Sequence, residues 1–159
     1  MTVDGTDCPI QEPSPFSKKW FMKKHKCAGL RYEVGVCIQT GDICWINGPF
    51  KCGRWPDLSI FRRDLKQLLA PGEMVECDLG YRGDDACRHK HVFFNEGDIQ
   101  AKAAARARHE TVNGDIKRFD CLKQPWRHDR HQHKIAFSSC AVVTQLSYNI
   151  EGRPYPVEY

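Results

Sequence analysis

The sequence predicts an α/β fold in which helices cover a mixed sheet. Two observations lead to this prediction. Runs of β-branched and aromatic residues, typical of strands, occupy much of the first half, and segments with apolar residues at helical spacing follow them. The chain has 159 residues, of which 41% are hydrophobic and 28% charged, a balance typical of a globular protein. We therefore expect one domain over residues 1–159, with a core of ordinary size.

Two short strands are predicted to end in aspartates. Residues 2–6 form the first strand, and Asp4 is expected at its end because Asp-Gly-Thr is typical of a turn. Residues 74–77 form a later strand that leads directly into Asp78. In α/β sheets ligands gather near strand ends, so the two carboxylates can face one another if these strands are neighbours.

A hairpin and a helix separate these two strands. Residues 30–39 and 43–47 are β-branched and aromatic, and Thr-Gly-Asp between them is typical of a hairpin turn. Apolar residues spaced by about 3.6 then predict an amphipathic helix over residues 57–69. Asp57 is interpreted as its N-cap, and Pro71-Gly72 ends it.

Two further helices are predicted in the second half. The first covers about residues 99–121, with an apolar stripe formed by Val112, Ile116 and Phe119. Glu110 lies on the other side of this helix, together with Arg106, Asn113, Gly114 and Lys117. The last helix covers about residues 131–148 and is rich enough in apolar residues to be well buried.

Asp4, Asp78 and Glu110 can thus form a pocket of three carboxylates. Hard oxygen ligands of this kind suit Mg²⁺ or Mn²⁺, which also accept phosphate oxygens as ligands. Two such ions, about 3.5–4 Å apart, activate the attacking oxygen and stabilise the leaving oxygen in phosphodiester displacement. The spacing alone leaves open whether the aspartates are only turn formers.

Two groups of basic residues lie on either side of the acidic stretch between Glu73 and Asp85 in the sequence. The first group lies between residues 18 and 26, next to Trp20 and Phe21, and consists of Lys18, Lys19, Lys23, Lys24 and Lys26. A second basic run covers residues 127–134. A metal-binding acidic centre flanked by bases suits a protein that handles a polyanion, although such lysines can also be ordinary solvated residues. Arg106 and Lys117 lie one or two helical turns from Glu110, so they could equally contact a phosphate or face solvent.

Other metal and thiol chemistry is less well supported. Nine cysteines contain no CxxC pair and are expected to be reduced and mostly buried. A zinc site formed by Cys87, His89 and His91, or by His128, His131 and His133, matches no tetrahedral spacing pattern. No stretch is apolar enough to span a membrane, and no signal peptide is recognisable at the N-terminus.

Several ordered motifs resemble landmarks of one family. They are Asp4-Gly5-Thr6, residues 31–36 (RYEVGV), residues 45–50 (WINGPF), Trp55-Pro56-Asp57, residues 78–81 (DLGY) and residues 106–117 (RARHETVNGDIK). In this order they resemble the DDE superfamily of endonucleases, close to the PIF/Harbinger transposases. The resemblance extends to the C-terminal residues 154–159 (PYPVEY).

The resemblance implies an RNase H-like fold and metal-dependent cleavage and transfer of DNA strands. It places the catalytic, metal-binding carboxylates at Asp4, Asp78 and Glu110, with two Mg²⁺ or Mn²⁺ ions as cofactors. It also implies a nuclear location in a eukaryote, and an intracellular one otherwise.

One departure from the family bears on partners. Relatives usually carry a helix-turn-helix segment before the first catalytic strand, and only three residues precede Asp4 here. A separate DNA-binding protein is therefore an expected partner besides DNA, and self-association stays open. The alternative function is that of a domesticated, non-catalytic DNA-binding or adaptor protein derived from a transposase.

Overall fold

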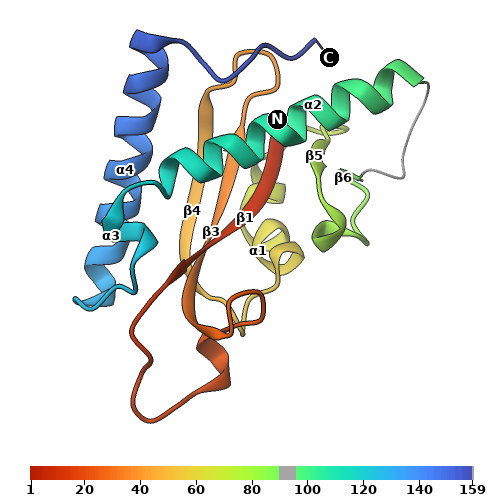
Figure 1. The fold of residues 1–159 in the computed structure, drawn as a ribbon. Coiled ribbons are helices and arrows are strands. Elements are labelled where there is room, and N and C mark those ends of the chain that lie inside the picture. The colour runs from red at the N-terminus through yellow and green to blue at the C-terminus, as the bar shows by residue number, and fades with distance from the viewer. Residues whose placement is uncertain (90–95, 159) are drawn as a thin grey trace.

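A computed structural model describes residues 1–89 and 96–158 of the chain, and within these ranges six strands form one mixed sheet (Figure 1). The strands are β1 (Thr2–Pro9), β2 (Phe21–Met22), β3 (Cys27–Val36), β4 (Ile43–Lys51), β5 (Val75–Cys77) and β6 (Cys87–His89).

Four α-helices flank this sheet in the described part of the chain. They are α1 (Asp57–Arg63), α2 (Glu96–Ile116), α3 (Asp120–Lys123) and α4 (Arg130–Glu151). Three short 3-10 helices join them, η1 (Lys18–Trp20), η2 (Leu65–Leu68) and η3 (Leu79–Tyr81). The predicted α/β class is confirmed, and the arrangement is consistent with an RNase H-like domain.

The sheet combines both kinds of pairing, with the strand order β2-β3-β1-β5-β6 and β4 paired to β3. β3 pairs antiparallel with both β1 and β4, and the second pairing confirms the predicted hairpin. β5 lies parallel to β1 and to β6. β1 is therefore the central strand that joins the antiparallel and parallel parts of the sheet.

β1 is longer than predicted. The expectation that Asp4 ends the first strand is wrong, because the strand continues to Pro9. Each residue from Thr2 to Pro9 has a partner on β3, and this ladder overrides the tendency of Asp-Gly-Thr to form a turn. On its other side β1 pairs with β5 only at Thr2 and Val3. Asp4 is thus the first residue of β1 beyond its parallel partner.

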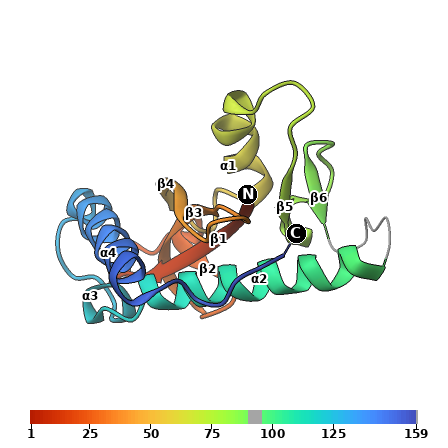
Figure 2. The same ribbon diagram turned by 90° about the horizontal axis from the view of Figure 1, so that it is seen from above.

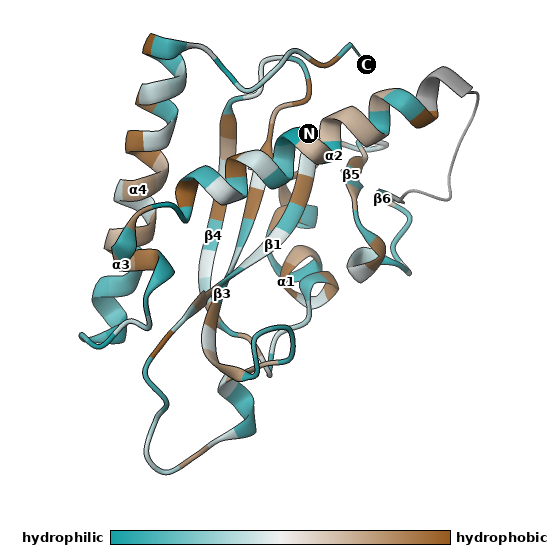
Figure 3. Cartoon of the chain, viewed as in Figure 1, coloured by the Kyte–Doolittle hydropathy of each residue, from teal (hydrophilic) through white to brown (hydrophobic). Residues whose placement is uncertain are grey.

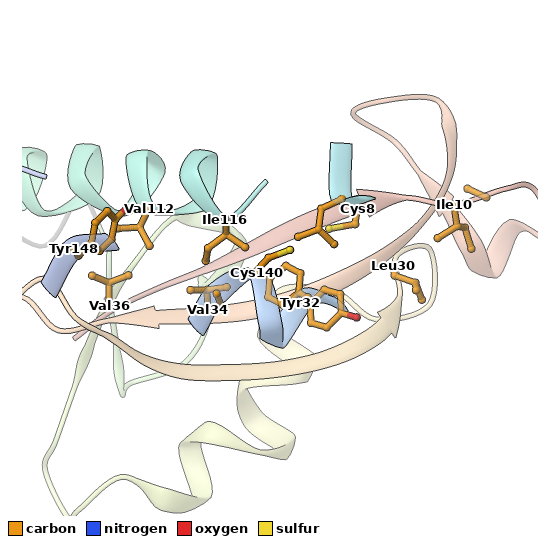
Figure 4. Close-up of a cluster of buried hydrophobic side chains, with 14 residues drawn as sticks. Cys8, Ile10, Leu30, Tyr32, Val34, Val36, Val112, Ile116, Cys140 and Tyr148 are labelled. Atoms are coloured by element: carbon orange, nitrogen blue, oxygen red, sulfur yellow. The ribbon is translucent and has the colours of Figure 1, made fainter. Parts of the chain in front are cut away.

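The two faces of the sheet are covered by different helices (Figure 2). On one face, buried residues of β1 and β3 pack against α2, α3 and α4, as Figure 4 shows. This cluster includes Tyr32, whose ring stacks on Phe137 with centroids 3.8 Å apart. The other face packs against α1 and η2 through a smaller cluster that includes Val3 and Phe61. Because side chains alternate along β1, its neighbouring residues face different helices.

Two predicted helices end earlier than expected. The helix predicted over residues 57–69 consists of α1 and η2, separated by Asp64 with φ −120° and ψ −72°. The helix predicted over residues 99–121 ends at Ile116, and α3 follows after a turn. Phe119 lies in that turn, although its side chain still packs against the core beside Val112 and Ile116.

α4 confirms the predicted last helix but is not buried on all sides. Apolar residues appear as brown bands along α4 in Figure 3, and among them Ile135 and Ile150 are 68% and 84% exposed. α4 lies at one side of the molecule and contacts β4, α2 and α3 (Figure 1). No helix in the described ranges is both long and apolar enough to cross a membrane.

All nine cysteines are free, as predicted, and five of them are buried. The buried ones are Cys8, Cys52, Cys77, Cys87 and Cys140.

Two glycines provide a test of this packing. Gly114 lies inside α2, and a β-carbon there would have no atom within 4 Å, so Gly114→Ala should raise the free energy of unfolding by about 0.5–1 kcal/mol. Gly35 of β3 pairs with Trp45 of β4, and a β-carbon on Gly35 would lie 2.7 Å from the Trp45 β-carbon. Gly35→Ala should lower the free energy of unfolding by about 1–3 kcal/mol. Urea unfolding of both variants measures the difference, and equal effects would contradict this packing.

Candidate active site

An open cavity of about 740 Å³ lies where β1 extends past the end of β5. Its walls come from β1, the start of α1, the segment after β5 and the middle of α2. All three predicted carboxylates line it, namely Asp4, Asp78 and Glu110. The fold therefore brings together residues that lie far apart in the sequence.

Asp4 lies on the face of β1 that α2 covers. Its Oδ2 accepts a hydrogen bond of 3.2 Å from Asn113 Nδ2 on α2. The Gly5 N–H donates to its Oδ1 at 2.8 Å. The neighbouring Thr2 is hydrogen-bonded to the buried His109 of α2, Oγ1 to Nδ1, at 2.7 Å. These contacts fix the carboxylate against one segment of α2.

Asp78 follows β5 directly, as predicted. The parallel register pairs Val3 with Cys77, so the next residues along the two strands, Asp4 and Asp78, lie side by side. Asp78 Oδ1 accepts a 2.7 Å hydrogen bond from the Gly80 N–H, and this contact caps the 3-10 helix η3. A local turn therefore holds this carboxylate at the C-terminal end of β5.

Glu110 is exposed on α2, one helical turn before Asn113. It thus enters the cavity from the same helix segment that contacts Asp4. Gly114 lies beside it in the cavity wall, where the lack of a side chain leaves open space.

Asp57 is a residue whose predicted role was wrong. Pro56, with φ −62° and ψ 151°, is the N-cap of α1, and Asp57 is the first residue of the helix itself. Its carboxylate instead lines the cavity, and Oδ1 is 3.1 Å from Nη1 of Arg31. Arg31 also binds both oxygens of Asp7, at 2.7 and 2.9 Å. The sequence motif Trp55-Pro56-Asp57 includes this residue, but the spacing of Asp57 from the other acids did not predict that it lines the same cavity.

The basic residues predicted to bind DNA divide into two groups. Lys23, Lys24, Arg106 and Lys117 line the cavity, whereas Lys18, Lys19 and Lys26 do not. η1, which carries Lys18 and Lys19, is held through Trp20, whose ring lies 4.6 Å from Lys51 Nζ and 4.8 Å from Arg130 Cζ. The cavity thus has acids at its centre and bases from two separate segments in its wall.

Comparison with known families agrees with this arrangement. Residues 3–145 match the family model described as DDE superfamily endonuclease. The chain belongs to the DDE superfamily of endonucleases. The members of this superfamily are transposase-like nucleases, so the family match indicates a nuclease-type enzyme. No significant match was found among curated proteins or among solved structures.

The family match confirms the predicted resemblance at the level of the superfamily. The matched range contains the three predicted acids, Asp57 and the bases of the cavity wall. It ends at residue 145, so the resemblance noted for residues 154–159 is not part of it.

The electrostatics of this DDE endonuclease centre on Asp4. The pKa of its carboxyl is raised from the ordinary 3.8 to about 7, and burial is the largest cause. The charges of Asp78, Asp57 and Glu110 contribute to this rise, while the Gly5 hydrogen bond opposes it. The pKa of Asp57 is also raised, first by burial and then by Asp7 and Asp78, although Arg31 opposes this effect. A divalent cation would relieve this concentration of negative charge.

The donor set fits Mg²⁺ or Mn²⁺. Endonucleases of this superfamily generally use divalent metals, and Asp4, Asp78 and Glu110 offer the carboxylate oxygens that such ions prefer. In the described part of the chain, no three His, Cys, Asp or Glu side chains lie close enough together to ligate one ion. The fit therefore rests on donor chemistry and on the cluster of negative charge around the half-buried Asp4.

One histidine of the zinc hypothesis, His133, has another role in the structure. His133 is fully buried, and its Nδ1 is hydrogen-bonded to the Tyr32 hydroxyl at 2.8 Å. Its ring packs against Trp126 with centroids 5.1 Å apart. Burial lowers its pKa to about 4, so it is a neutral core residue. His91, which the other zinc pattern includes, lies outside the described residues.

Asp4 should make stability depend on pH when no divalent cation is bound. Its pKa is higher in the folded than in the unfolded protein, so the contribution is full below about pH 3.8 and is lost as the pH rises through 7. From about pH 5 to about pH 8, the free energy of unfolding of the wild type should fall on the order of 2 kcal/mol more than that of Asp4→Asn. Urea unfolding in EDTA measures both.

Glu33 provides an internal control for this comparison. Burial also raises its carboxyl pKa to about 7, but both proteins contain it, so the difference between them isolates Asp4. Identical pH dependence of the two proteins would show that Asp4 does not titrate in this range.

Proposed function

We propose that this chain is the catalytic core of a PIF/Harbinger-type transposase that cuts and joins DNA with two Mg²⁺ or Mn²⁺ ions. The observation that carries the proposal is the meeting of Asp4, Asp78 and Glu110 in one cavity whose wall also holds basic residues. The family match supports the nuclease chemistry. These three carboxylates would hold the ions.

The chain's own residues would position the reactants. Asn113 and the Gly5 N–H orient the half-buried Asp4 carboxylate, and the Gly80 N–H orients Asp78. Lys23 and Lys24 approach the cavity from the segment after η1, and Lys117 from the end of α2, where they would hold the phosphates of a DNA backbone. Bound ions would neutralise phosphate charge and lower the pKa of an attacking water.

The proposed reaction has two steps at one site. Water attacks a phosphodiester at the transposon end, the bond from phosphorus to the 3′ oxygen breaks, and a 3′-hydroxyl and a 5′-phosphate are formed. The freed 3′-hydroxyl then attacks a phosphodiester of the target DNA, the bond from that phosphorus to the target's 3′ oxygen breaks, and the target strand is left with a 3′-hydroxyl while its 5′ side is joined to the transposon end. The protein forms no covalent bond to DNA in this scheme, because its contribution is positioning and charge.

The proposal also covers partners and location. DNA is the substrate, and a separate DNA-binding protein would direct the enzyme to its sites. In a eukaryotic cell the protein would act in the nucleus, where that substrate lies.

Removal of one acid should abolish cleavage without unfolding the protein. Asp78→Asn and Glu110→Gln keep the side-chain shape but remove a negative charge, so we expect Mn²⁺-dependent nicking of plasmid DNA to fall at least about a hundredfold. Asp85→Asn is the matched control, because that side chain is 93% exposed and does not line the cavity. Unchanged nicking by Asp78→Asn would remove it from the mechanism. Metal-independent DNA binding without any nicking by the wild type would favour the non-catalytic adaptor.

The basic residues of the cavity wall should matter more than those outside it. The double variant Lys23→Ala, Lys24→Ala should weaken DNA binding and reduce the slope of log K against log salt by about 0.9 for each phosphate that the protein no longer neutralises. Lys18→Ala, Lys19→Ala removes the same charge outside the cavity wall and should have a smaller effect. Fluorescence anisotropy at several salt concentrations compares the two. Equal slopes would indicate that DNA does not follow the cavity.

A further inference from the structure

Asp57 is a half-buried carboxylate that the three-acid site does not use. It lies in the first turn of α1, on the opposite side of β1 from α2, yet it lines the same cavity as Asp4 and Asp78. Asp4 belongs to the α2 face of β1, whereas Gly5, the next residue, faces α1. Asp57 therefore approaches the acidic centre from the side that α2 cannot reach.

Two glycines allow this approach. A β-carbon on Gly5 would lie 2.2 Å from Asp57 Oδ1, so the carboxylate rests directly on the backbone of β1. A β-carbon on Gly80 would lie 3.2 Å from Asp57 Oδ2 and 2.9 Å from Asp78 Oδ1. The carboxylates of Asp57 and Asp78 thus flank the same point beside Gly80. Any side chain at Gly5 or Gly80 would displace one of them.

Arg31 determines which oxygen of Asp57 faces Asp78. Its Nη1 lies 3.1 Å from Asp57 Oδ1, while its Nε and Nη2 bind both oxygens of Asp7. One guanidinium is therefore shared between two carboxylates. The Asp57 oxygen on the side of Gly80 and Asp78 is Oδ2, and the Arg31 contact keeps it in that direction.

A helix-capping role does not account for this placement. Pro56 occupies the N-cap position, so Asp57 is the first residue inside α1 and not its cap. An ion pair with Arg31 alone would not require the carboxylate to lie against Gly5 and Gly80, next to further negative charge. A multivalent cation between the acids would offset that charge.

We propose that Asp57 is a fourth acidic residue of the metal centre, whose Oδ2 contacts a bound Mg²⁺ or Mn²⁺ together with Asp78. The inference rests on the proposed function, since it assigns an additional residue to the same site. Arg31 is then the positioning residue that orients this carboxylate, and Gly5 and Gly80 provide the space that the approach needs.

Direct measurement of Mn²⁺ binding tests the assignment without a cleavage assay. Titration of the full chain with Mn²⁺, followed by the electron paramagnetic resonance signal of the free ion, gives the affinity in the absence of DNA. Asp57→Asn keeps the shape of the side chain and should weaken Mn²⁺ binding at least about tenfold. Asp57→Ser, a smaller substitution, should do the same and serves if the asparagine disturbs folding, which circular dichroism checks.

Two control variants separate a metal contact from loss of the ion pair. Asp7→Asn removes the other partner of Arg31 but not the carboxylate that flanks Gly80, so its Mn²⁺ affinity should stay within about twofold of wild type. Asp85→Asn, outside the cavity, should bind like wild type. Thermal unfolding without metal gives an independent readout, because a purely structural ion pair predicts an equally large loss of Tm in Asp57→Asn and Asp7→Asn.

The outcomes distinguish this inference from the function on which it rests. If the wild type binds Mn²⁺ and nicks DNA while folded Asp57→Asn binds the ion with wild-type affinity, the fourth-acid assignment is overturned and the three-acid site stands. If Asp57→Asn and Asp7→Asn weaken Mn²⁺ binding equally, Asp57 acts only through Arg31 and the assignment is also overturned. If the wild type binds no Mn²⁺, both proposals fall.

Discussion

The unequal pairing of β1 on its two sides determines the rest of the site. Antiparallel pairing with β3 extends over all eight residues of the strand, whereas the parallel partner β5 pairs with only two of them. The free edge begins at Asp4, and the chain leaving β5 places Asp78 beside it. Because β1 has no partner strand on this side beyond Val3, carboxylates from other elements can lie beside Asp4 at the surface of the sheet.

Side-chain alternation along β1 then divides the site between two layers. Residues facing α2 contact Asn113 and His109, and residues facing α1 contact Arg31 and Asp57. The hydrophobic clusters on the two faces hold α2 and α1 in place, so the positions of the acids depend on packing some distance away. α2 is further tied to the hairpin, because the buried Arg108 donates to the Cys37 and Ile38 carbonyls just after β3.

This construction concentrates negative charge at a cost to the folded state. Asp4 has a raised pKa because it is buried next to other carboxylates, and that repulsion persists until a cation or a proton neutralises it. Such strain is common at functional sites, where a ligand offsets it. The surrounding bases belong to the segment after η1 and to α2, so they can attract a polyanion without neutralising the central acids.

The amino-acid sequence was sufficient to predict the order of the main elements, the hairpin, the family and three of the acids that share the cavity, but not the short β2, β6 and α3. Periodicity and ordered motifs are local features of the sequence, so they can be recognised without the tertiary structure. The length of β1 follows only from the folded structure, because a ladder with β3 outweighed the turn tendency of Asp-Gly-Thr. The same is true of the position of Asp57 and of which lysines line the cavity, since these depend on the register of strands and on helix packing across the sheet. Contacts between residues far apart in the chain leave no local pattern, and for this reason Asp57 has the sequence pattern of a helix cap although its side chain lines the cavity.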